Sequence, residues 1–351
     1  MQIILAIDSF KGCLTSEEIE KAFAHSLTAK GIKVRSLPMS DGGEGMLEAF
    51  ISALHGHIVQ AYVHDPLMRP ILANYGITSE KTAIIESAQA CGLTLMTAEE
   101  RNPLAATTYG VGELITHAIH QGCRKFIIGL GGSGTSDAGT GMLKALSEHF
   151  SSKGEIDDVL AQMTGYQFIL ASDVRNPLYG KEGAAVTFAP QKGATPDIVE
   201  ELDRRAQHFA NLSAKHMGKD LSSQPGSGAA GGLGYAFMQY FNATVQSGAD
   251  LLLDLTRFDE LLKDTDLVIT GEGHADSQTL MGKLPERVMQ RAKKHQIPVW
   301  LVAGQVDDTE KLIKAGFTRV DKLTPEKMDL QEAIKPEITK QNIACWVNRN
   351  I

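Results

Sequence analysis

The sequence has few of the features that mark a secreted protein, a membrane protein or a protein stabilised by a structural metal site. Its four cysteines are scattered, with no CxxC pair and no histidine at zinc-ligand spacing, which excludes a disulfide framework and a cysteine-based zinc site. No apolar run approaches transmembrane length, and the opening run is too short for the apolar core of a signal peptide. We therefore expect a cytoplasmic chain with reduced thiols and no membrane partner.

Neither sign of charge gathers in one place. The 34 basic and 42 acidic residues leave a net charge of −8, and the lysines and arginines form no basic stripe, so nucleic acid is not an expected partner. Apolar residues make up 43% of the chain and charged residues 22%, as in ordinary globular proteins. A length of 351 residues is long for one compact domain and ordinary for two.

Several common catalytic motifs are also missing. There is no Walker A motif, no VAIK or HRD set, no HExxH and no GxSxG. Gly129, Gly131 and Gly134 match G-x-G-x-x-G after an apolar run, but no second strand ends in an acidic residue about twenty positions later, as a dinucleotide site requires. A dehydrogenase is therefore only an alternative.

Short β-branched runs alternate with helical patterns along the chain. This alternation predicts an α/β protein with mainly parallel sheets, whose ligands collect at the carboxyl ends of the strands. Thr15 and Glu18 form a capping box that predicts the first helix start, so Lys11 lies on the loop before it. The strands are expected in the runs QIILAI, KVRSLPM, TAIIESA, KFIIGL, YQFILAS, DLVITGE and PVWLVAG.

The segment from Lys125 to Phe150 is the most informative. An apolar strand pattern runs into GGSGTSDAGTG and then into an amphipathic helix, which predicts a glycine loop at a helix N-terminus. Free N–H groups and the helix dipole attract anions there. Because Asp137 in this loop would repel a phosphate unless a cation lay between them or the carboxylate took part in the chemistry, the loop suggests a metal-linked phosphate site.

Other polar or glycine-rich clusters follow expected strands or precede helices. They are DSFKG at 8–12, SDGGEG at 40–45, ASDVRNPL at 171–178, FAPQKG at 188–193, PGSGAAGGLG at 225–234 and TGEGHADSQTLMGK at 270–283. Each has a structural alternative: a polar turn, a solvated loop lysine in the case of Lys192, or close packing through small residues at 225–234. Four ionisable groups follow the strand DLVI, namely Glu272, His274, Asp276 and Lys283. Burying them near the end of a strand costs free energy unless a ligand or metal compensates their charge, so this segment indicates a binding site.

These blocks, together with DPLMRP, NPLAATTYGVGELI, GLGGSGTSDAGTGML and VITGEGHADSQTLMGKLP, resemble the bacterial type I glycerate kinases in order and over nearly the whole chain. The resemblance implies transfer of the ATP γ-phosphate to D-glycerate with Mg²⁺, at the 2-hydroxyl in preference to the 3-hydroxyl. It also implies two α/β domains, of which a Rossmann-like or flavodoxin-like parallel-sheet domain is interrupted by the other. We expect 1–75 and 266–351 in the interrupted domain, 76–265 in the insertion, and the active site in a cleft between them.

Phosphoryl transfer needs positioning, charge neutralisation and an oriented hydroxyl. Lys11 and Lys192 are candidates for phosphate contacts, and either Asp41 or Asp173 for the group that orients or deprotonates the glycerate hydroxyl. The glycerate carboxylate needs a cation, for which Arg69, His274 and Lys283 are available; the family usually has arginine at position 274. Candidates for Mg²⁺ are Asp137, Glu272 and Asp276. Further candidates for substrate and phosphate binding are Asp8, Ser9, Gly42, Glu44, Gly131, Gly132, Ser133, Asn176 and Gly228.

A third class of function, a non-catalytic sugar-acid or nucleotide sensor, would use similar acidic and glycine loops. A sensor normally carries an output element, and the sequence shows neither a helix-turn-helix nor a basic face.

Overall fold

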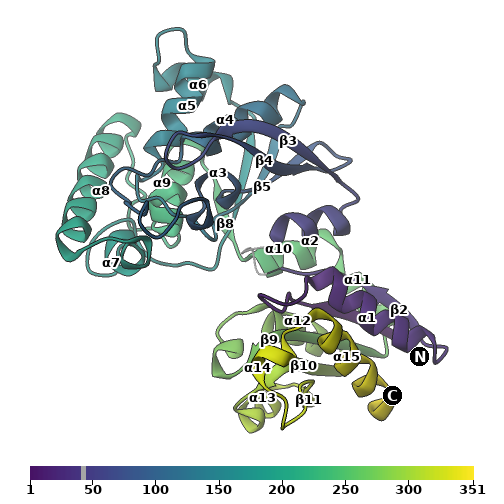
Figure 1. Cartoon of the computed structure of the whole chain (residues 1–351). Coiled ribbons are helices and arrows are strands. Elements are labelled where there is room, and N and C mark those ends of the chain that lie inside the picture. The colour runs from purple at the N-terminus through teal and green to yellow at the C-terminus, as the bar shows by residue number, and fades with distance from the viewer. Residues whose placement is uncertain (41–44) are drawn as a thin grey trace. The chain divides into compact units, whose positions relative to one another are not determined.

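The computed structural model describes residues 1–40 and 45–351, and Figure 1 shows its helices and strands. The predicted Asp41, Gly42 and Glu44 lie outside the described residues. Contacts divide the chain into two compact units. Unit 1 contains Met1–Asp41, Glu48–Leu54 and Gly248–Ile351, and unit 2 contains Gly42–Leu47 and His55–Ser247.

Unit 1 has a five-stranded parallel sheet in the order β2-β1-β9-β10-β11. Counted within the unit this order is 2-1-3-4-5, which is the flavodoxin-like order, and the chain changes direction across the sheet between β1 and β9. The strands are β1 (Gln2–Ile7), β2 (Lys33–Ser36), β9 (Leu267–Ala275), β10 (Val299–Val306) and β11 (Arg319–Lys322).

Helices cover this sheet, and β1 is buried from its second residue onward, as a strand with both faces covered must be. Helices α1 and α15 lie side by side, and Phe23 and Trp346 pack in one core with the β1 side chains (Figure 1). The helices of this unit are α1 (Ser16–Thr28), α10 (Gly248–Leu255), α11 (Phe258–Leu261), α12 (Leu284–Lys294), α13 (Thr309–Ala315), α14 (Leu330–Ala333) and α15 (Pro336–Asn350). Helix α2 (Met46–Ala53) contributes its part from Glu48.

The capping box predicted at the start of α1 is confirmed. The Thr15 side chain accepts a hydrogen bond from Glu18 N, and Thr15 N donates to the Glu18 carboxylate. This reciprocal pair satisfies two backbone donors at the start of the helix and ends the loop that follows β1.

Unit 2 has a six-stranded sheet in the order β3-β4-β5-β6-β7-β8. Strands β5 to β8 are parallel, while β3 and β4 form an antiparallel hairpin that joins the sheet through β5. The strands are β3 (His57–His64), β4 (Pro70–Ile77), β5 (Thr82–Glu86), β6 (Lys125–Gly129), β7 (Gln167–Ala171) and β8 (Thr244–Gln246). The helices are α3 (Ala88–Cys91), α4 (Tyr109–His120), α5 (Thr140–Phe150), α6 (Ile156–Gln162), α7 (Ala184–Phe188), α8 (Pro196–Met217) and α9 (Ala229–Phe241).

The expected domain boundaries at 75 and 266 differ from this division. Residues 57–77 form the hairpin of the second sheet, because the turn at Asp65–Arg69 joins two antiparallel strands and Gly76 pairs with Ile84 of β5. Residues 248–265 contribute α10 and α11 to unit 1. The fold is α/β, with two mainly parallel sheets.

Candidate functional site

Unit 1 has a pocket of about 700 Å³ at the carboxyl ends of β1, β9, β10 and β11. This is where a parallel sheet is expected to bind ligands, and β1 and β9 flank the position at which the strand order reverses. Seven candidates predicted from the sequence lie in the segments 8–12 and 270–283, and the pocket brings six of them together: Asp8, Ser9, Lys11, Glu272, His274 and Lys283.

The charged groups of this pocket are held by specific partners. Glu272 is 8% exposed; its Oε2 lies 2.9 Å from Lys283 Nζ, and its Oε1 accepts a hydrogen bond of 2.7 Å from Thr279 Oγ1. Asp8 is also 8% exposed, and its Oδ1 accepts a 2.7 Å hydrogen bond from Ser9 N. The pocket therefore offers two nearly buried carboxylates beside two lysines, which suits a charged ligand.

His274 extends from the end of β9, and its Nε2 lies 2.8 Å from Asp307 Oδ2. This hydrogen bond lowers the pKa of the Asp307 carboxyl. Both side chains are more than half exposed, so the pair is solvated and contributes little to stability.

Asp276 was expected to bind a metal, but it does not line the pocket within the described chain. Its Oδ1 accepts a 2.8 Å hydrogen bond from Gln278 N, and its own N–H donates to Thr279 Oγ1. Asp276 thus caps the 3₁₀ turn Ser277–Leu280 and orients Thr279, which in turn holds Glu272.

In unit 2 the glycine loop predicted from the sequence joins β6 to α5. The backbone N–H groups at the N-terminus of α5 already have hydrogen-bond acceptors within the protein. Gly139 N donates to Asp137 Oδ1 at 3.0 Å and Gly141 N to Asp137 Oδ2 at 3.1 Å. Oδ2 also accepts hydrogen bonds from Thr108 N and from the Thr108 hydroxyl. The donors that we expected to meet a phosphate therefore meet Asp137, which caps α5.

Lys192 is buried against the same loop, so the interpretation of a solvated lysine is wrong. Its side chain is 2% exposed, and its Nζ donates to Thr135 O at 2.6 Å and to Ser133 Oγ at 3.0 Å. Burial lowers the pKa of Lys192 to about 8, although the nearby Cys91 and Asp137 act in the opposite direction. An ammonium in this place orders the loop that contains Gly131, Gly132 and Ser133.

Asn176 and Gly228 also lie together in unit 2. Gly228 N donates to Asn176 O at 2.9 Å, and the Asn176 amide donates to Glu182 O. A Cβ at Gly228 would lie 2.3 Å from Pro177 O, which explains why glycine is needed there. Asp173 is exposed, two residues beyond the end of β7.

The helix start expected in PGSGAAGGLG has a different form. Ala230, Gly231 and Gly232 have left-handed backbone angles inside α9. A Cβ at Gly231 would lie 2.1 Å from Thr135 O, so the small residues allow this segment to pack closely against the glycine loop. Close packing, the alternative that the sequence left open, accounts for this cluster.

Arg69 is engaged in structural contacts rather than left available for a glycerate carboxylate. Its Nε donates to Asp65 Oδ2 at 2.6 Å, and its two terminal nitrogens donate to Glu100 Oε1 and Leu95 O. Asp65 is buried, which by itself raises the pKa of its carboxyl, but hydrogen bonds from the backbone N–H and the guanidinium of Arg69 and from Leu67 N lower that pKa overall. The guanidinium therefore fixes the turn between β3 and β4.

A second pocket, of about 560 Å³, lies beside Asp137 in unit 2. Thr107 and Thr140 line it together with Lys144 and Arg205, so it combines hydroxyl groups with two cations. We did not single out Thr107 or Thr108 from the sequence, although both stand in the NPLAATTYGVGELI block. Gln305, Thr324 and Asn342 of the unit 1 pocket were missed as well, because they lie beyond the strand runs that carried the prediction.

Within residues 1–40 and 45–351, no group of three or more His, Cys, Asp and Glu side chains could hold a metal ion. In the same residues no helix is long and apolar enough to cross a membrane. All four cysteines are free thiols.

Comparison with known proteins identifies the family. A model of the glycerate kinase family matches residues 3–349. The chain is 36% identical to a glycerate kinase of Bacillus subtilis, over 95% of this chain and 93% of the relative. It is 37% identical to a glycerate 2-kinase of Escherichia coli, over 100% of this chain and 97% of the relative.

A solved structure from Salmonella typhimurium LT2, named as a glycerate kinase 2, superposes with a TM-score of 0.84 at 35% identity and covers 99% of this chain and 98% of its own. These matches favour neither the dehydrogenase nor the sensor. The chain therefore belongs to the glycerate kinase family, and it is an ATP-dependent phosphotransferase that acts on glycerate.

Proposed function

We propose that this chain transfers the γ-phosphate of ATP to the 2-hydroxyl of D-glycerate and that Mg²⁺ takes part in the transfer. The choice of the 2-hydroxyl is supported by the likeness to the Escherichia coli relative named glycerate 2-kinase. The structural observation that carries the proposal is the pocket at the strand-order reversal of unit 1, with Asp8 and Glu272 beside Lys11 and Lys283.

The oxygen ligands in this pocket fit Mg²⁺. Magnesium usually binds proteins through one or two carboxylates and takes its other ligands from water and substrate phosphates. Asp8 and Glu272 supply carboxylates of this kind, so a complete protein cage is not needed. Bound with the nucleotide, Mg²⁺ neutralises charge on the phosphate oxygens.

Lys11 and Lys283 are proposed to contact phosphate oxygens as point charges. Lys283 is 38% exposed in its side chain and pairs with Glu272, so a bound phosphate would compete with that carboxylate for the ammonium. His274 is proposed to meet the glycerate carboxylate, and Asp307 holds its imidazole in place.

In unit 2, the loop at Gly131–Ser133 is proposed to contact phosphate through its backbone, with Lys192 as a positioning residue beneath it. Asp137 is assigned the same positioning role, because four hydrogen bonds between its carboxylate and backbone or Thr108 donors hold the loop. Asp173 and Asp41 stay the two candidates for the group that orients the glycerate hydroxyl.

The test is a product assay with D-glycerate, ATP and Mg²⁺. Enolase converts 2-phosphoglycerate directly to phosphoenolpyruvate, whereas 3-phosphoglycerate first needs a mutase. We expect phosphoenolpyruvate without added mutase. If it forms only when mutase is added, the transfer is to the 3-hydroxyl and the proposed regiochemistry is wrong.

The metal requirement needs a separate readout, because enolase itself depends on Mg²⁺. Reactions with EDTA are therefore stopped and their ADP is measured by chromatography; we expect none above the enzyme-free blank. Asp173→Asn and Asp41→Asn are compared under the same conditions. Wild-type kcat in both variants would show that neither carboxylate orients the hydroxyl.

A further inference from the structure

We infer that the apolar end of the unit 1 pocket binds the adenine base of ATP, while the charged end of the same pocket faces the nucleotide phosphates. The inference rests on the proposed kinase function, which supplies the ligand. The inference places the adenine base against α14, α15 and the segment after β11. The glycine motifs of the sequence gave no indication of a nucleotide site in this part of the chain.

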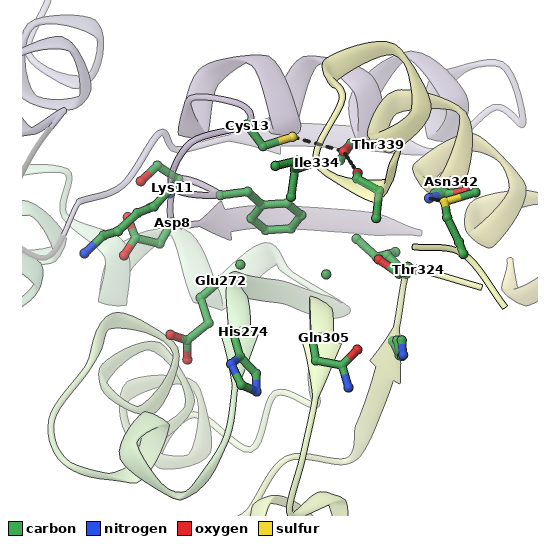
Figure 2. Close-up of a pocket in the computed structure, with 18 of the residues that line it drawn as sticks. Asp8, Lys11, Cys13, Glu272, His274, Gln305, Thr324, Ile334, Thr339 and Asn342 are labelled. Carbon is green, nitrogen blue, oxygen red and sulfur yellow. Dashed lines mark hydrogen bonds between the residues drawn. The ribbon is translucent and has the colours of Figure 1, made fainter. Parts of the chain in front are cut away.

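The pocket has two chemically different ends. Figure 2 shows Asp8, Lys11 and Glu272 on one side, and Ile334, Thr324 and Asn342 toward the other. The lining of the pocket also includes the apolar side chains of Phe10, Leu323, Met328, Ala333 and Ile334. A nucleotide has the same division, with an apolar aromatic base at one end and anionic phosphates at the other.

The pocket is larger than glycerate alone would fill. A volume of about 700 Å³ lies within the range of pockets that enclose a ligand of drug size. Glycerate is a small acid whose atoms are mostly polar, so it has no surface that would gain from contact with Phe10 and Leu323, both of which are at most 6% exposed. A flat aromatic base does gain from such contacts.

Polar groups at the apolar end suit the edge of adenine. Asn342 lines the pocket, and among the described residues its amide nitrogen contacts the Met328 sulfur at 3.7 Å, which is a weak acceptor. The side chain can exchange that contact for a stronger one at little cost. An asparagine amide offers a donor beside an acceptor, and adenine presents the matching acceptor and amino donor on one edge.

Ile334 offers a clean test of the apolar end because it lines the pocket while being 42% exposed. A carboxylate at this position would oppose an apolar base without disrupting the core. We compare Ile334→Glu with Ile313→Glu on α13, where the isoleucine is 48% exposed and does not line the pocket. The matched pair separates loss of the base contact from a general effect of one added negative charge on unit 1.

Binding is measured by calorimetry with Mg²⁺ and either ADP or inorganic tripolyphosphate, in the absence of glycerate. We expect Ile334→Glu to weaken ADP binding by at least about tenfold, the effect of a modest mismatch in an apolar pocket. Tripolyphosphate binding should stay within about twofold of wild type, since that ligand has no base. Ile313→Glu should bind both ligands as the wild type does.

Asn342→Asp provides a second, smaller change. A carboxylate accepts hydrogen bonds only, so it matches the adenine amino group but not the adjacent ring nitrogen, and it matches the donor edge of guanine better. The ratio of the ATP to the GTP specificity constant should therefore fall by about tenfold. The KM for glycerate should stay unchanged in both pocket variants.

Wild-type ADP binding by Ile334→Glu, or equal loss of ADP and tripolyphosphate in both pocket variants, would overturn the assignment. A rise in the KM for glycerate with ADP affinity unchanged would overturn it too, by placing glycerate at this end. The calorimetric results are independent of turnover, whereas the specificity constants and the KM for glycerate are not. If the ADP pattern appears but glycerate is not phosphorylated, the proposed function fails and the base site stands.

Discussion

The buried ammonium of Lys192 leads to a prediction about how stability depends on pH. Lys192 is 2% exposed and is held by Thr135 O and Ser133 Oγ. Burial disfavours the charged form and lowers its pKa from the ordinary 10.5 to about 8. The substitution Lys192→Met keeps much of the aliphatic side chain and removes the titrating group.

The direction in which the free energy of unfolding changes with pH follows from the number of protons bound in each state. Between about pH 8 and pH 10.5 the unfolded chain keeps the Lys192 proton while the folded chain has lost it. The unfolded state thus binds more protons, and the free energy of unfolding rises with pH in this window. Below about pH 8 both states are protonated and this contribution is constant. The pKa difference between the unfolded and folded states corresponds to a change of about 3 kcal/mol in the free energy of unfolding, and most of this change should appear between pH 7 and pH 10.

The assay is guanidinium unfolding of wild type and Lys192→Met at several pH values from 7 to 10. Other groups titrate in this range, but they do so in both proteins, so the difference between the two free energies isolates Lys192. We expect wild type to gain about 2–3 kcal/mol relative to the variant as the pH rises. Lys181→Met, which removes an exposed lysine of the same unit, should leave that dependence unchanged.

A constant difference between wild type and Lys192→Met across this range would refute the reasoning, because it would mean that burial does not favour the neutral amine. The same ammonium orders the glycine loop, so we also expect Lys192→Met to lower kcat more than it raises the KM for either substrate. An unchanged kcat would remove Lys192 from the positioning role while leaving the stability argument intact.

Three further substitutions test packing, capping and the turn arginine. Gly231→Ala should lower the free energy of unfolding of unit 2 by about 2–4 kcal/mol, because the φ of Gly231 is +64° and the added Cβ would lie 2.1 Å from Thr135 O. Gly154→Ala is the control: its φ is +74° but the space around it is open, so the loss should be only about 1 kcal/mol. Thr15→Ala should lower the free energy of unfolding by about 1 kcal/mol, and no loss would mean that the capping box is not formed in solution. Arg69→Met should destabilise the protein, because the buried Asp65 loses the guanidinium donor to its Oδ2 while its Oδ1 keeps two backbone donors, and the KM for glycerate should stay unchanged; a large rise in that KM alone would restore the substrate role.

Most of the parallel strands could be predicted because their signals are local. QIILAI, KFIIGL and DLVITGE are apolar runs bounded by turn residues, and each contributes a strand. The hairpin of β3 and β4 was missed for a physical reason: its outer face is exposed, with Tyr62 84% and Leu72 49% accessible, so it lacks the continuous apolar run of a strand buried on both faces. The expected boundary at residue 75 differs from the division into units because the hairpin was not foreseen.

The candidate site was predictable where residues follow buried strands. Asp8, Lys11 and Glu272 could be grouped because carboxyl ends of parallel strands meet at one edge of the sheet. The roles of Asp137 and Lys192 could not be read in the same way. Both depend on contacts between segments far apart in the sequence, namely Thr108 with Asp137 and Thr135 with Lys192, and no local pattern specifies those pairs.

The two glycine clusters of unit 2 show why a fingerprint of glycines is an incomplete argument for phosphate binding. Glycine gives a loop freedom to expose N–H groups, but it equally allows other groups to approach the backbone. Close approach explains these residues: Gly141 faces the Thr107 hydroxyl and Gly231 faces the Thr135 carbonyl, each at a distance that excludes a Cβ. The donors at the start of α5 then go to Asp137. Such a loop can bind an anion only through N–H donors that do not already form hydrogen bonds within the protein. The pocket of unit 1 combines lysines and a nearly buried Glu272 with apolar side chains, which match the two parts of a nucleotide, so it is a stronger candidate for the nucleotide than the loop that most resembles a nucleotide motif.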